Sequence, residues 1–231
     1  MSPTRAEADA TEDAARVLRV DASIRDAGSV GRSLADEAVD ALGRDRDGVV
    51  VTRRDLGREP LPPVWPAAEA ARTTPVGERT GPQRHAAELA AGLVDELLDA
   101  DVLVVAAPMY NFGPPQQVKH WIDLVITDHR AMDVNVPILP GRPALLVATR
   151  GGAYGTGTPR AGWDHATPFL RRILADVWGL DLTVVEVELT AADEVPAMAG
   201  LREAARRQLA DAHDLVREWA ATIATRRTVG G

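Results

Sequence analysis

The amino-acid sequence predicts one α/β domain whose five strands form an open, doubly wound parallel sheet with helices on both faces. Short apolar runs alternate along the 231-residue chain with segments of helical periodicity. Two of the runs, 101–107 and 143–149, are almost continuously apolar, which is typical of strands buried on both faces. The hydrophobic content of 45% is sufficient for one sizeable core.

The elements are expected in strict alternation. Strands are predicted at 17–20, 48–52, 101–107, 143–149 and 182–189. Helices are predicted at 29–43, 83–98, 114–127, 164–178 and 197–225. The fifth strand ends in alternating apolar and acidic residues, which favours a sheet edge with one wet face. The last helix carries an apolar stripe at spacings of three and four, formed by Met198, Leu201, Ala205, Leu209, Ala212, Val216, Trp219 and Ile223.

Two segments fall outside this alternation. Residues 1–15 are polar and acidic and lack the apolar core of a signal peptide, so we expect a disordered leader before a single domain at 16–231. The Pro-rich stretch 54–82 is expected to be irregular. A structureless segment of that length is either a functional lid or interface loop, or a loosely ordered surface excursion.

Composition excludes several function classes. The formal net charge of −8 argues against nucleic-acid and anionic-membrane partners. No apolar run approaches the roughly 20 residues that span a bilayer, so a cytoplasmic protein is expected. The absence of cysteine excludes disulfides and thiolate chemistry. No metal site is expected, because the histidines lack ligand spacing with a carboxylate; they are His85, His120, His129, His165 and His213.

In doubly wound sheets, ligands bind outside the carboxyl ends of the strands. The loops after strands one, three and four should therefore converge on a site. The first loop, 21–33, places Ser23, Arg25 and Ser29 before a helix N-terminus, which is the chemistry that a phosphate requires. Alternatively, a serine in this loop simply caps the helix.

The second loop, 107–113, directly follows the most buried strand. Met109, Tyr110 and Phe112 are able to pack against a planar ring, and Asn111 can donate and accept hydrogen bonds at its polar edge. Pro108 opens this loop. The competing interpretation is a hydrophobic turn packed under a neighbouring subunit.

The third loop, 149–157, exposes backbone amides after another buried strand. Its adjacent Gly151 and Gly152 follow Thr149 and Arg150, and Tyr154 supplies an aromatic edge. Simple flexibility is the alternative explanation for its glycines. Among the tryptophans, Trp121, Trp178 and Trp219 are expected in the core or a dimer interface, whereas Trp163 is a candidate pocket wall.

These motifs together resemble the bacterial FMN-dependent NADH:quinone oxidoreductases, also called azoreductases. The resemblance rests on Ala107-Pro-Met-Tyr-Asn-Phe112, on Gln117-Val-Lys-His-Trp-Ile-Asp-Leu124 and on Arg150-Gly-Gly152, and it extends from Leu18 to Ile223. It implies a flavodoxin-like fold, noncovalently held FMN and a homodimer with its active sites at the subunit interface.

The resemblance also implies roles for residues. Pro108, Met109, Tyr110, Asn111 and Phe112 would hold the isoalloxazine ring. The ring's other edge would meet Thr149, Arg150, Gly151 and Gly152. Ser23 and Ser29 would serve the phosphate, with Arg25 in support. The chain departs from the family pattern at Ser29-Val30-Gly31, where Ser-Gln-Ser is usual, and at Tyr154, where a histidine is frequent.

The expected reaction is a two-step relay. NAD(P)H passes a hydride to the flavin and leaves, and a flat aromatic acceptor such as a quinone or azo compound then takes its place. No side chain need act as an acid or base, although Tyr154 could donate a hydrogen bond to the acceptor. Three alternatives stay open: an electron carrier like flavodoxin, a specialised tailoring reductase, and a fold that has lost FMN.

Overall fold

The computed structural model describes residues 14–44 and 48–228 of the chain, so the expected leader lies outside the described residues except for its last two positions. The strands are β1 (Ala15–Asp21), β2 (Val49–Asp55), β3 (Val102–Pro108), β4 (Pro143–Thr149) and β5 (Asp181–Val187). The α-helices are α2 (Val30–Arg44), α3 (Trp65–Thr73), α4 (Gly81–Asp99), α5 (Gln116–Thr127), α6 (Ala166–Arg171) and α7 (Arg202–Thr228). Three short helices are η1 (Val76–Glu78), η2 (Arg172–Val177) and η3 (Pro196–Leu201).

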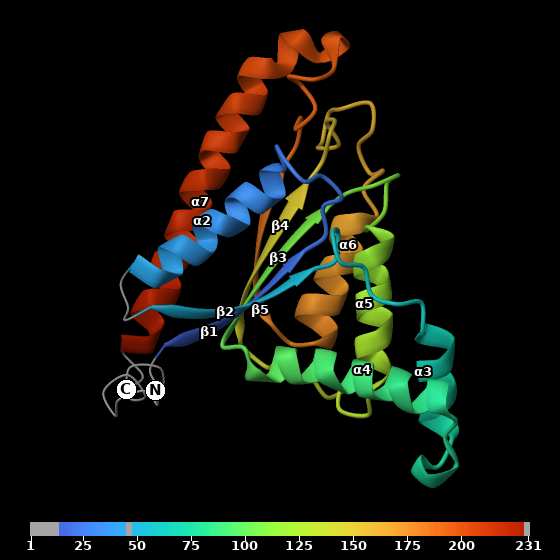
Figure 1. Cartoon of the computed structure of the whole chain (residues 1–231). Coiled ribbons are helices and arrows are strands. Elements are labelled where there is room, and N and C mark those ends of the chain that lie inside the picture. Colours follow the sequence, from blue (N-terminus) through green and yellow to red (C-terminus); the bar gives the residue numbers. More distant parts are fainter. Residues whose placement is uncertain (1–13, 45–47, 229–231) are drawn as a thin grey trace.

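The five strands form one parallel sheet in the order β2-β1-β3-β4-β5. This is the flavodoxin-like order, so the predicted fold is confirmed. Helices α2 and α7 cover one face of the sheet, and α4, α5 and α6 cover the other (Figure 1). The expected edge position of the fifth strand is also confirmed. Among the described residues, no helix is both long and apolar enough to cross a membrane.

Side-chain alternation along the central strands separates two hydrophobic cores. On β3, Leu103 and Val105 face the core beneath α4 and α5, whereas Val104 and Ala106 face the core beneath α2 and α7. Because side chains alternate across a strand, one apolar run stabilises both layers at once. The core positions expected for Trp121, Trp178 and Trp219 are confirmed, since all three are buried.

The segment 54–82 differs from the expectation of an irregular stretch. It contains α3, which begins at Trp65 with Pro66 in its first turn and continues through an alanine-rich sequence. Proline is tolerated in a first turn, because the N–H it lacks has no helical partner there. Ala68 and Ala71 are buried, and α3 packs on α4 and α5. The many prolines around this amphipathic segment led to the prediction of an irregular stretch.

Two other helices differ from their predicted form. The helix expected at 164–178 is α-helical only to Arg171 and then widens into the π-helical turn η2, whose last bond joins Trp178 N–H to the carbonyl of Ile173. The apolar stripe of the last helix is buried from Ala212 to Ile223, whereas Leu201 is 43% exposed. The reason is that η3 and the start of α7 extend past the carboxyl end of the sheet (Figure 1).

Candidate functional site

Loops from both ends of the chain meet at the carboxyl edge of the sheet and enclose a cavity of about 190 Å³. The lining residues come from the loops that follow β1, β3, β4 and β5. They are Ser23, Arg25, Gly28, Ser29, Val30, Pro108, Met109, Tyr110, Thr149, Gly151, Thr190 and Ala191. In a chain of net charge −8, no acidic residue lines this cavity and one arginine does. The lining itself therefore carries one positive charge, Arg25, which pairs with Glu194 just outside it.

The loop after β1 leads into the N-terminus of α2. Gly28 takes a φ of +68°, a conformation that glycine adopts without cost, and α2 begins two residues later. Ser23 is buried, and its hydroxyl oxygen accepts from the amide of Arg25 at 3.2 Å. The first amides of a helix lack intrahelical partners and point outward with the positive end of the dipole. This end of the loop is therefore a donor-rich cradle for an anion.

Arg25 crosses the mouth of the cavity. Its guanidinium makes two parallel hydrogen bonds to the carboxylate of Glu194, of 2.7 and 2.9 Å, and both side chains are about half exposed. The contact with Glu194 raises the pKa of Arg25, so the guanidinium stays charged. A phosphate in the cavity would compete with Glu194 for the same donors.

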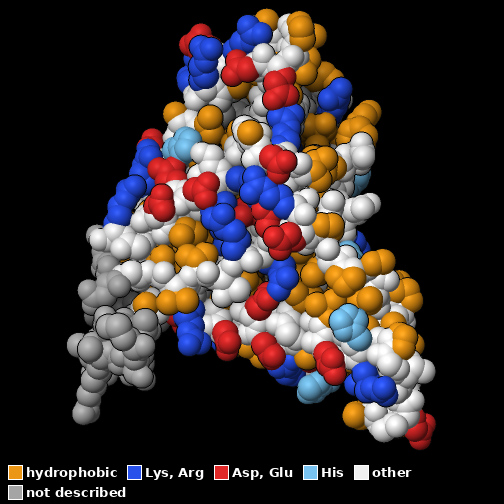
Figure 2. All heavy atoms as spheres, viewed as in Figure 1, with side chains coloured by type: hydrophobic (Ala, Val, Ile, Leu, Met, Phe, Trp, Pro, Cys, Tyr) orange, Lys and Arg blue, Asp and Glu red, His pale blue; other side chains and the backbone are white. Residues whose placement is uncertain are grey.

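A partly buried ion network beneath the sheet edge fixes this loop. Arg32 donates to both carboxylate oxygens of Asp55, at 2.6 and 2.8 Å, and to the carbonyl of Ser23 at 2.7 Å. Burial raises the pKa of Asp55, but the hydrogen bonds and charges of Arg32 and Arg58 together lower it by more, so its pKa lies below the usual value. The β2 edge is thereby tied to the cavity loop. Basic and acidic groups alternate down the middle of the face in Figure 2.

Gly57 shows how closely the two loops approach. A Cβ atom at this position would lie 2.0 Å from the backbone oxygen of Ser23, which is a severe overlap. The backbone amides of Leu56 and Gly57 also donate to the carbonyl of Asp21. The loop after β2 therefore supports the loop after β1 from behind, and only glycine fits at the contact.

The loop after β3 makes a tight turn. Tyr110 and Gly113 exchange two backbone hydrogen bonds of 3.0 Å, and the residues between them, Asn111 and Phe112, have φ values of 48° and 70°. Asparagine tolerates this left-handed conformation, but it is rare for an aromatic residue. Backbone strain of this kind clusters at functional sites. The turn directs Met109 and Tyr110 into the cavity and leaves Phe112 outside it.

Phe112 belongs to a separate aromatic wall. It is 41% exposed and packs edge-to-face against Trp163 at 5.6 Å and Tyr154 at 6.4 Å between ring centroids. The amide of His165 donates to the Phe112 carbonyl at 2.8 Å and ties the two loops together. Trp163 is itself 51% exposed, so this aromatic wall is an open surface.

The loop after β4 is bound to the loop after β5. Backbone amides of Leu189, Thr190 and Ala191 donate to the carbonyls of Gly152, Arg150 and Gly151. Leu189 has a φ of 61°, a second strained position beside the cavity. This contact brings Thr190 and Ala191 into the lining, which sequence reasoning missed. The predicted fifth strand could have indicated Thr190 and Ala191, because its carboxyl end lies at the same edge of the sheet.

The Arg150 side chain does not face the cavity. It is buried and pairs with Asp164 at 2.5 Å, Glu186 at 2.7 Å and Glu188 at 3.2 Å. Burial lowers the pKa of Arg150, but Glu186 and Asp164 together raise it by a larger amount, so the pKa is above its usual value. Its backbone amide and carbonyl also have partners in β5 and its loop. The Arg150 side chain is therefore held by carboxylates away from the cavity lining, and its predicted contact with the ring stays a prediction.

The structure brings most of the sequence-predicted residues into one cavity. Those that line it are Ser23, Arg25, Ser29, Pro108, Met109, Tyr110, Thr149 and Gly151. Those beside it are Asn111, Phe112, Gly152 and Tyr154, which form the turn and the aromatic wall. The lining residues that sequence reasoning did not single out are Gly28, Val30, Thr190 and Ala191.

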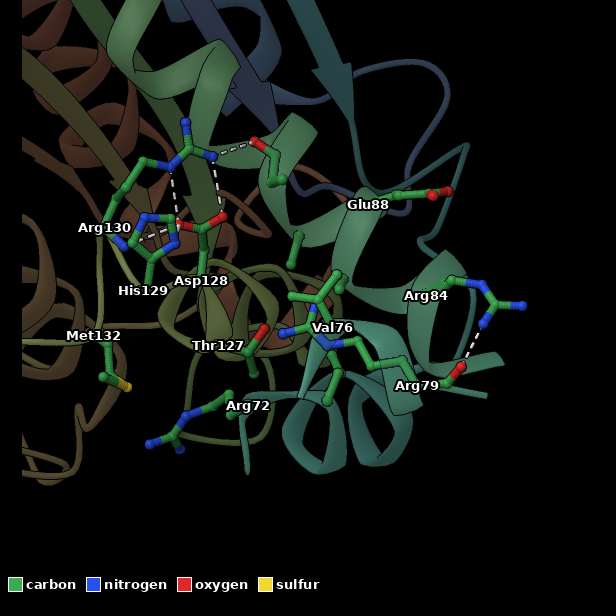
Figure 3. Close-up of a pocket in the computed structure, with 15 residues that line it drawn as sticks. Arg72, Val76, Arg79, Arg84, Glu88, Thr127, Asp128, His129, Arg130 and Met132 are labelled. Atoms are coloured by element: carbon green, nitrogen blue, oxygen red, sulfur yellow. Dashed lines mark hydrogen bonds and ion pairs between the residues drawn. The ribbon is translucent and has the colours of Figure 1, made fainter. Parts of the chain in front are cut away.

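A larger cavity of about 450 Å³ lies between α3, α4 and the end of α5. Figure 3 shows Arg130 and Asp128 turned toward one another at one side of it and Arg79 and Arg84 at the other. Arg130 donates to Asp128 and Asp95, so its charge is already neutralised. The cavity of about 190 Å³ adjoins the opposite end of α5, roughly 18 Å away along the helix. Size alone does not identify the site, because another cavity of about 450 Å³ lies beside the N-terminus of α2 and shares Gly28, Ser29 and Val30 with the cavity of about 190 Å³.

Comparison with known proteins agrees with this geometry. The model of a family described as having a flavodoxin-like fold matches residues 15–211. An FMN-dependent NADH:quinone oxidoreductase from Frankia alni is 37% identical over 207 residues, which cover 89% of this chain and 98% of that protein. One from Kineococcus radiotolerans is 37% identical over 216 residues, covering 90% and 99%. The chain belongs to the family of FMN-dependent NADH:quinone oxidoreductases.

Solved structures in this oxidoreductase group share the architecture. The azoreductase AzrA superimposes with a TM-score of 0.73 at 20% identity, covering 90% of this chain and all of that one. An FMN-dependent NADH-azoreductase from Bacillus anthracis, solved in complex with FMN, gives a TM-score of 0.70 at 17% identity, covering 90% and 99%. At this identity the likeness shows the fold alone.

The residues of this chain fit FMN as a ligand. A phosphate requires donors and positive potential, and the cavity supplies hydroxyls, a helix N-terminus and Arg25. A flavin ring requires flat apolar contacts with polar groups at one edge, and the loops after β3 and β4 supply Met109, Tyr110 and backbone amides beside Gly151. No carboxylate in the lining would repel the phosphate.

Proposed function

We propose that this chain is an FMN-dependent oxidoreductase that transfers two electrons from NADH to a flat aromatic acceptor such as a quinone or an azo compound. The observation that carries the proposal is the acid-free cavity at the carboxyl edge of the sheet, with its anion cradle and its strained aromatic loop. The names of the relatives from Frankia alni and Kineococcus radiotolerans support the same cofactor and donor.

The phosphate end of the cofactor belongs at the N-terminus of α2. Ser23, Ser29 and the first amides of the helix donate to the phosphate oxygens, and Arg25 exchanges Glu194 for the phosphate. In this chain Val30 and Gly31 stand where the family has polar residues. Backbone amides and Arg25 therefore replace side-chain contacts in our proposal.

The isoalloxazine ring belongs on the loop after β3. Bound FMN would supply the chemistry, accepting a hydride from NADH and returning two electrons to the acceptor. Met109 and Tyr110 flank the ring, and Asn111 meets its polar edge. Amides of Gly151 and Gly152 stabilise negative charge at that edge by preorganised donation. Tyr154 donates a hydrogen bond to the acceptor's oxygen or nitrogen, and Phe112 with Trp163 orients the acceptor.

The active unit in our proposal is a homodimer. The cavity of about 190 Å³ is smaller than the roughly 300–1,000 Å³ of typical small-molecule sites, so one protomer encloses only part of an FMN-sized ligand. Ile24, Phe112 and Trp163 leave large apolar surface exposed beside it. A second copy would cover this surface and complete the site. A cytoplasmic location belongs to the same proposal, because NADH is supplied there.

Steady-state kinetics tests the proposed order of events. Because NADH and the acceptor would use the same position in turn, double-reciprocal plots at several acceptor concentrations should be parallel. Sedimentation velocity of the same preparation should give a dimer. Intersecting lines that require a ternary complex, or an active monomer, would contradict these two parts of the proposal.

A further inference from the structure

Arg160 lies over the aromatic wall beside the proposed active site. Its guanidinium carbon is 5.8 Å from the centroid of the Tyr154 ring, within the range of a cation–π contact. Its Nη1 would be 3.2 Å from a Cβ on Gly152, so the absent side chain of that glycine makes room for the guanidinium. The Arg160 carbonyl accepts from Trp163 N–H at 3.1 Å, which fixes the turn that carries it.

Arg160 differs from the other arginines at this end of the sheet in its partners. Arg25 is paired with Glu194, and Arg150 is surrounded by three carboxylates. Within residues 14–44 and 48–228, no carboxylate forms an ion pair with Arg160. Its side chain is exposed, and all of its donors remain available to an incoming group. A positive charge thus lies against an aromatic ring, with no ion-pair partner in the described part of the chain.

The net charge of the chain makes this local charge informative. A protein with a net charge of −8 repels small anions at long range, so an anion that binds here must be attracted by a local charge. A single fixed guanidinium at the wall acts at short range, where it can make a bidentate contact with a carboxylate or sulfonate. The adjoining Phe112, Tyr154 and Trp163 offer edges and faces to a flat ring. The arrangement matches an aromatic ring that carries an acidic substituent.

We propose that Arg160 selects acceptors that bear an anionic substituent, a carboxylate or sulfonate, on the aromatic ring. This inference rests on the proposed function and names the substrate class of the same site. The aromatic ring lies against the Phe112–Trp163 wall, and its acidic group binds the guanidinium. Arg160 determines specificity and takes no part in the electron transfer itself.

The test compares one acceptor with its neutralised form. The FMN-loaded protein is given a naphthoquinone that carries a ring carboxylate, and separately the methyl ester of the same quinone, with NADH as donor. For Arg160→Gln we expect kcat/KM for the acid to fall about tenfold, mainly through KM, and that for the ester to change less than twofold. Arg160→Lys should retain part of the preference, because it keeps the charge but not the planar fork.

A second measurement uses no turnover. Naphthalene carboxylate and its methyl ester are titrated into the oxidised, FMN-loaded protein, and binding is followed by the flavin absorption spectrum. The Kd of the acid should be about tenfold higher in Arg160→Gln than in the native protein. In the native protein, the Kd of the acid should also rise with added salt. The Kd of the ester should change in neither case. The matched control is Arg172→Gln, which removes the same charge from an exposed position on η2 that pairs with Asp176.

The outcomes separate this inference from the proposed function. If FMN binds and NADH reduces it, but the acid-to-ester ratio is the same in the native protein, Arg160→Gln and Arg172→Gln, the selectivity proposal is wrong and the oxidoreductase stands. If the ratio falls equally in both variants, a general charge effect replaces the role of Arg160. If FMN does not bind, the proposed function itself is wrong.

Discussion

Phe112 occupies a backbone conformation that an aromatic residue rarely adopts. Its φ of 70° would suit glycine, yet the position holds a ring that is 41% exposed and contacts Trp163 and Tyr154. A position where local propensity is violated without a folding gain is characteristic of a functional site. We therefore infer that the strained turn serves to present the phenyl ring of Phe112 to the proposed acceptor.

Substitution of Phe112 by glycine or alanine separates strain from ring loss. Both variants lose the ring, but only alanine keeps a Cβ in the left-handed region. We expect Phe112→Gly to be more stable than Phe112→Ala by about 1 kcal/mol in urea unfolding. Both should raise the KM for the acceptor. Equal stabilities, or an alanine variant more stable than the glycine variant, would show that the turn is not strained.

Gly57 is the residue where added volume should do most harm near the cavity. A Cβ would meet the Ser23 carbonyl at 2.0 Å, so the loop after β1 has to move. Gly57→Ala should cost on the order of 2 kcal/mol of unfolding free energy and weaken FMN binding, as measured by fluorescence titration. Gly77→Ala is the control, because nothing lies within 4 Å of its Cβ position. Similar effects from both substitutions would refute the close contact as the cause.

Sequence patterns predicted which residues line the cavity where a loop carries its own chemistry, but not where long-range ion pairs decide how a side chain is oriented. Ser23, Met109 and Tyr110 line the cavity as expected. The side chain of Arg150, which the family resemblance placed at the edge of the ring, does not line the cavity, because its acidic partners Asp164, Glu186 and Glu188 lie 14 to 38 residues further along the chain. Long-range pairing of this kind leaves no local pattern.

At the scale of elements, the strands and most helices were predictable because their apolar periodicity is set by burial. The exceptions have local causes. Helix α3 was hidden by surrounding prolines although Pro66 stands where a helix begins. The π-helical turn η2 and the 3₁₀ start of α7 depend on how backbone hydrogen bonds settle against neighbours, which periodicity alone does not encode.

The β2 edge and the loop after β1 act as one element through Arg32 and Asp55. Asp55→Asn leaves a largely buried guanidinium with only the more distant carboxylate of Asp21, at 3.7 Å, and weakens the support that Arg32 gives to the carbonyl of Ser23. We expect a loss on the order of 3 kcal/mol in unfolding free energy and weaker FMN binding. Glu69→Gln, which breaks the exposed pair with Arg72, should cost less than about 0.5 kcal/mol. A comparable loss in both variants would contradict the importance of burial.

At the scale of the whole molecule, four carboxyl groups among the described residues have lowered pKa values: Glu37, Asp55, Asp128 and Asp164. In each, burial raises the pKa, but hydrogen bonds and nearby charges together lower it by a larger amount. Groups with depressed pKa values in the folded state stabilise it above their unfolded values, and this stability is lost as the pH falls through the folded values. The unfolded values are 4.5 for Glu and 3.8 for Asp.

Stability should therefore fall steeply below about pH 4 and hold between about pH 5 and 7 as far as these carboxyls are concerned. Urea midpoints measured from pH 7 down to pH 3 give the profile. Asp55→Asn should flatten its acid limb, because one of the contributing groups is gone. A native midpoint that is constant down to pH 3 would contradict the pKa directions.

The central claim is that the cavity at the carboxyl edge of the sheet binds FMN and passes electrons from NADH to an aromatic acceptor. The most direct measurement is an anaerobic absorption titration. The flavin-free protein is titrated with FMN, then reduced with one equivalent of NADH, and finally mixed with a naphthoquinone. We predict saturable FMN binding, loss of the oxidised flavin absorbance with NADH, and its full return with the quinone. A protein that binds no FMN, or whose bound FMN NADH does not reduce, would contradict the account.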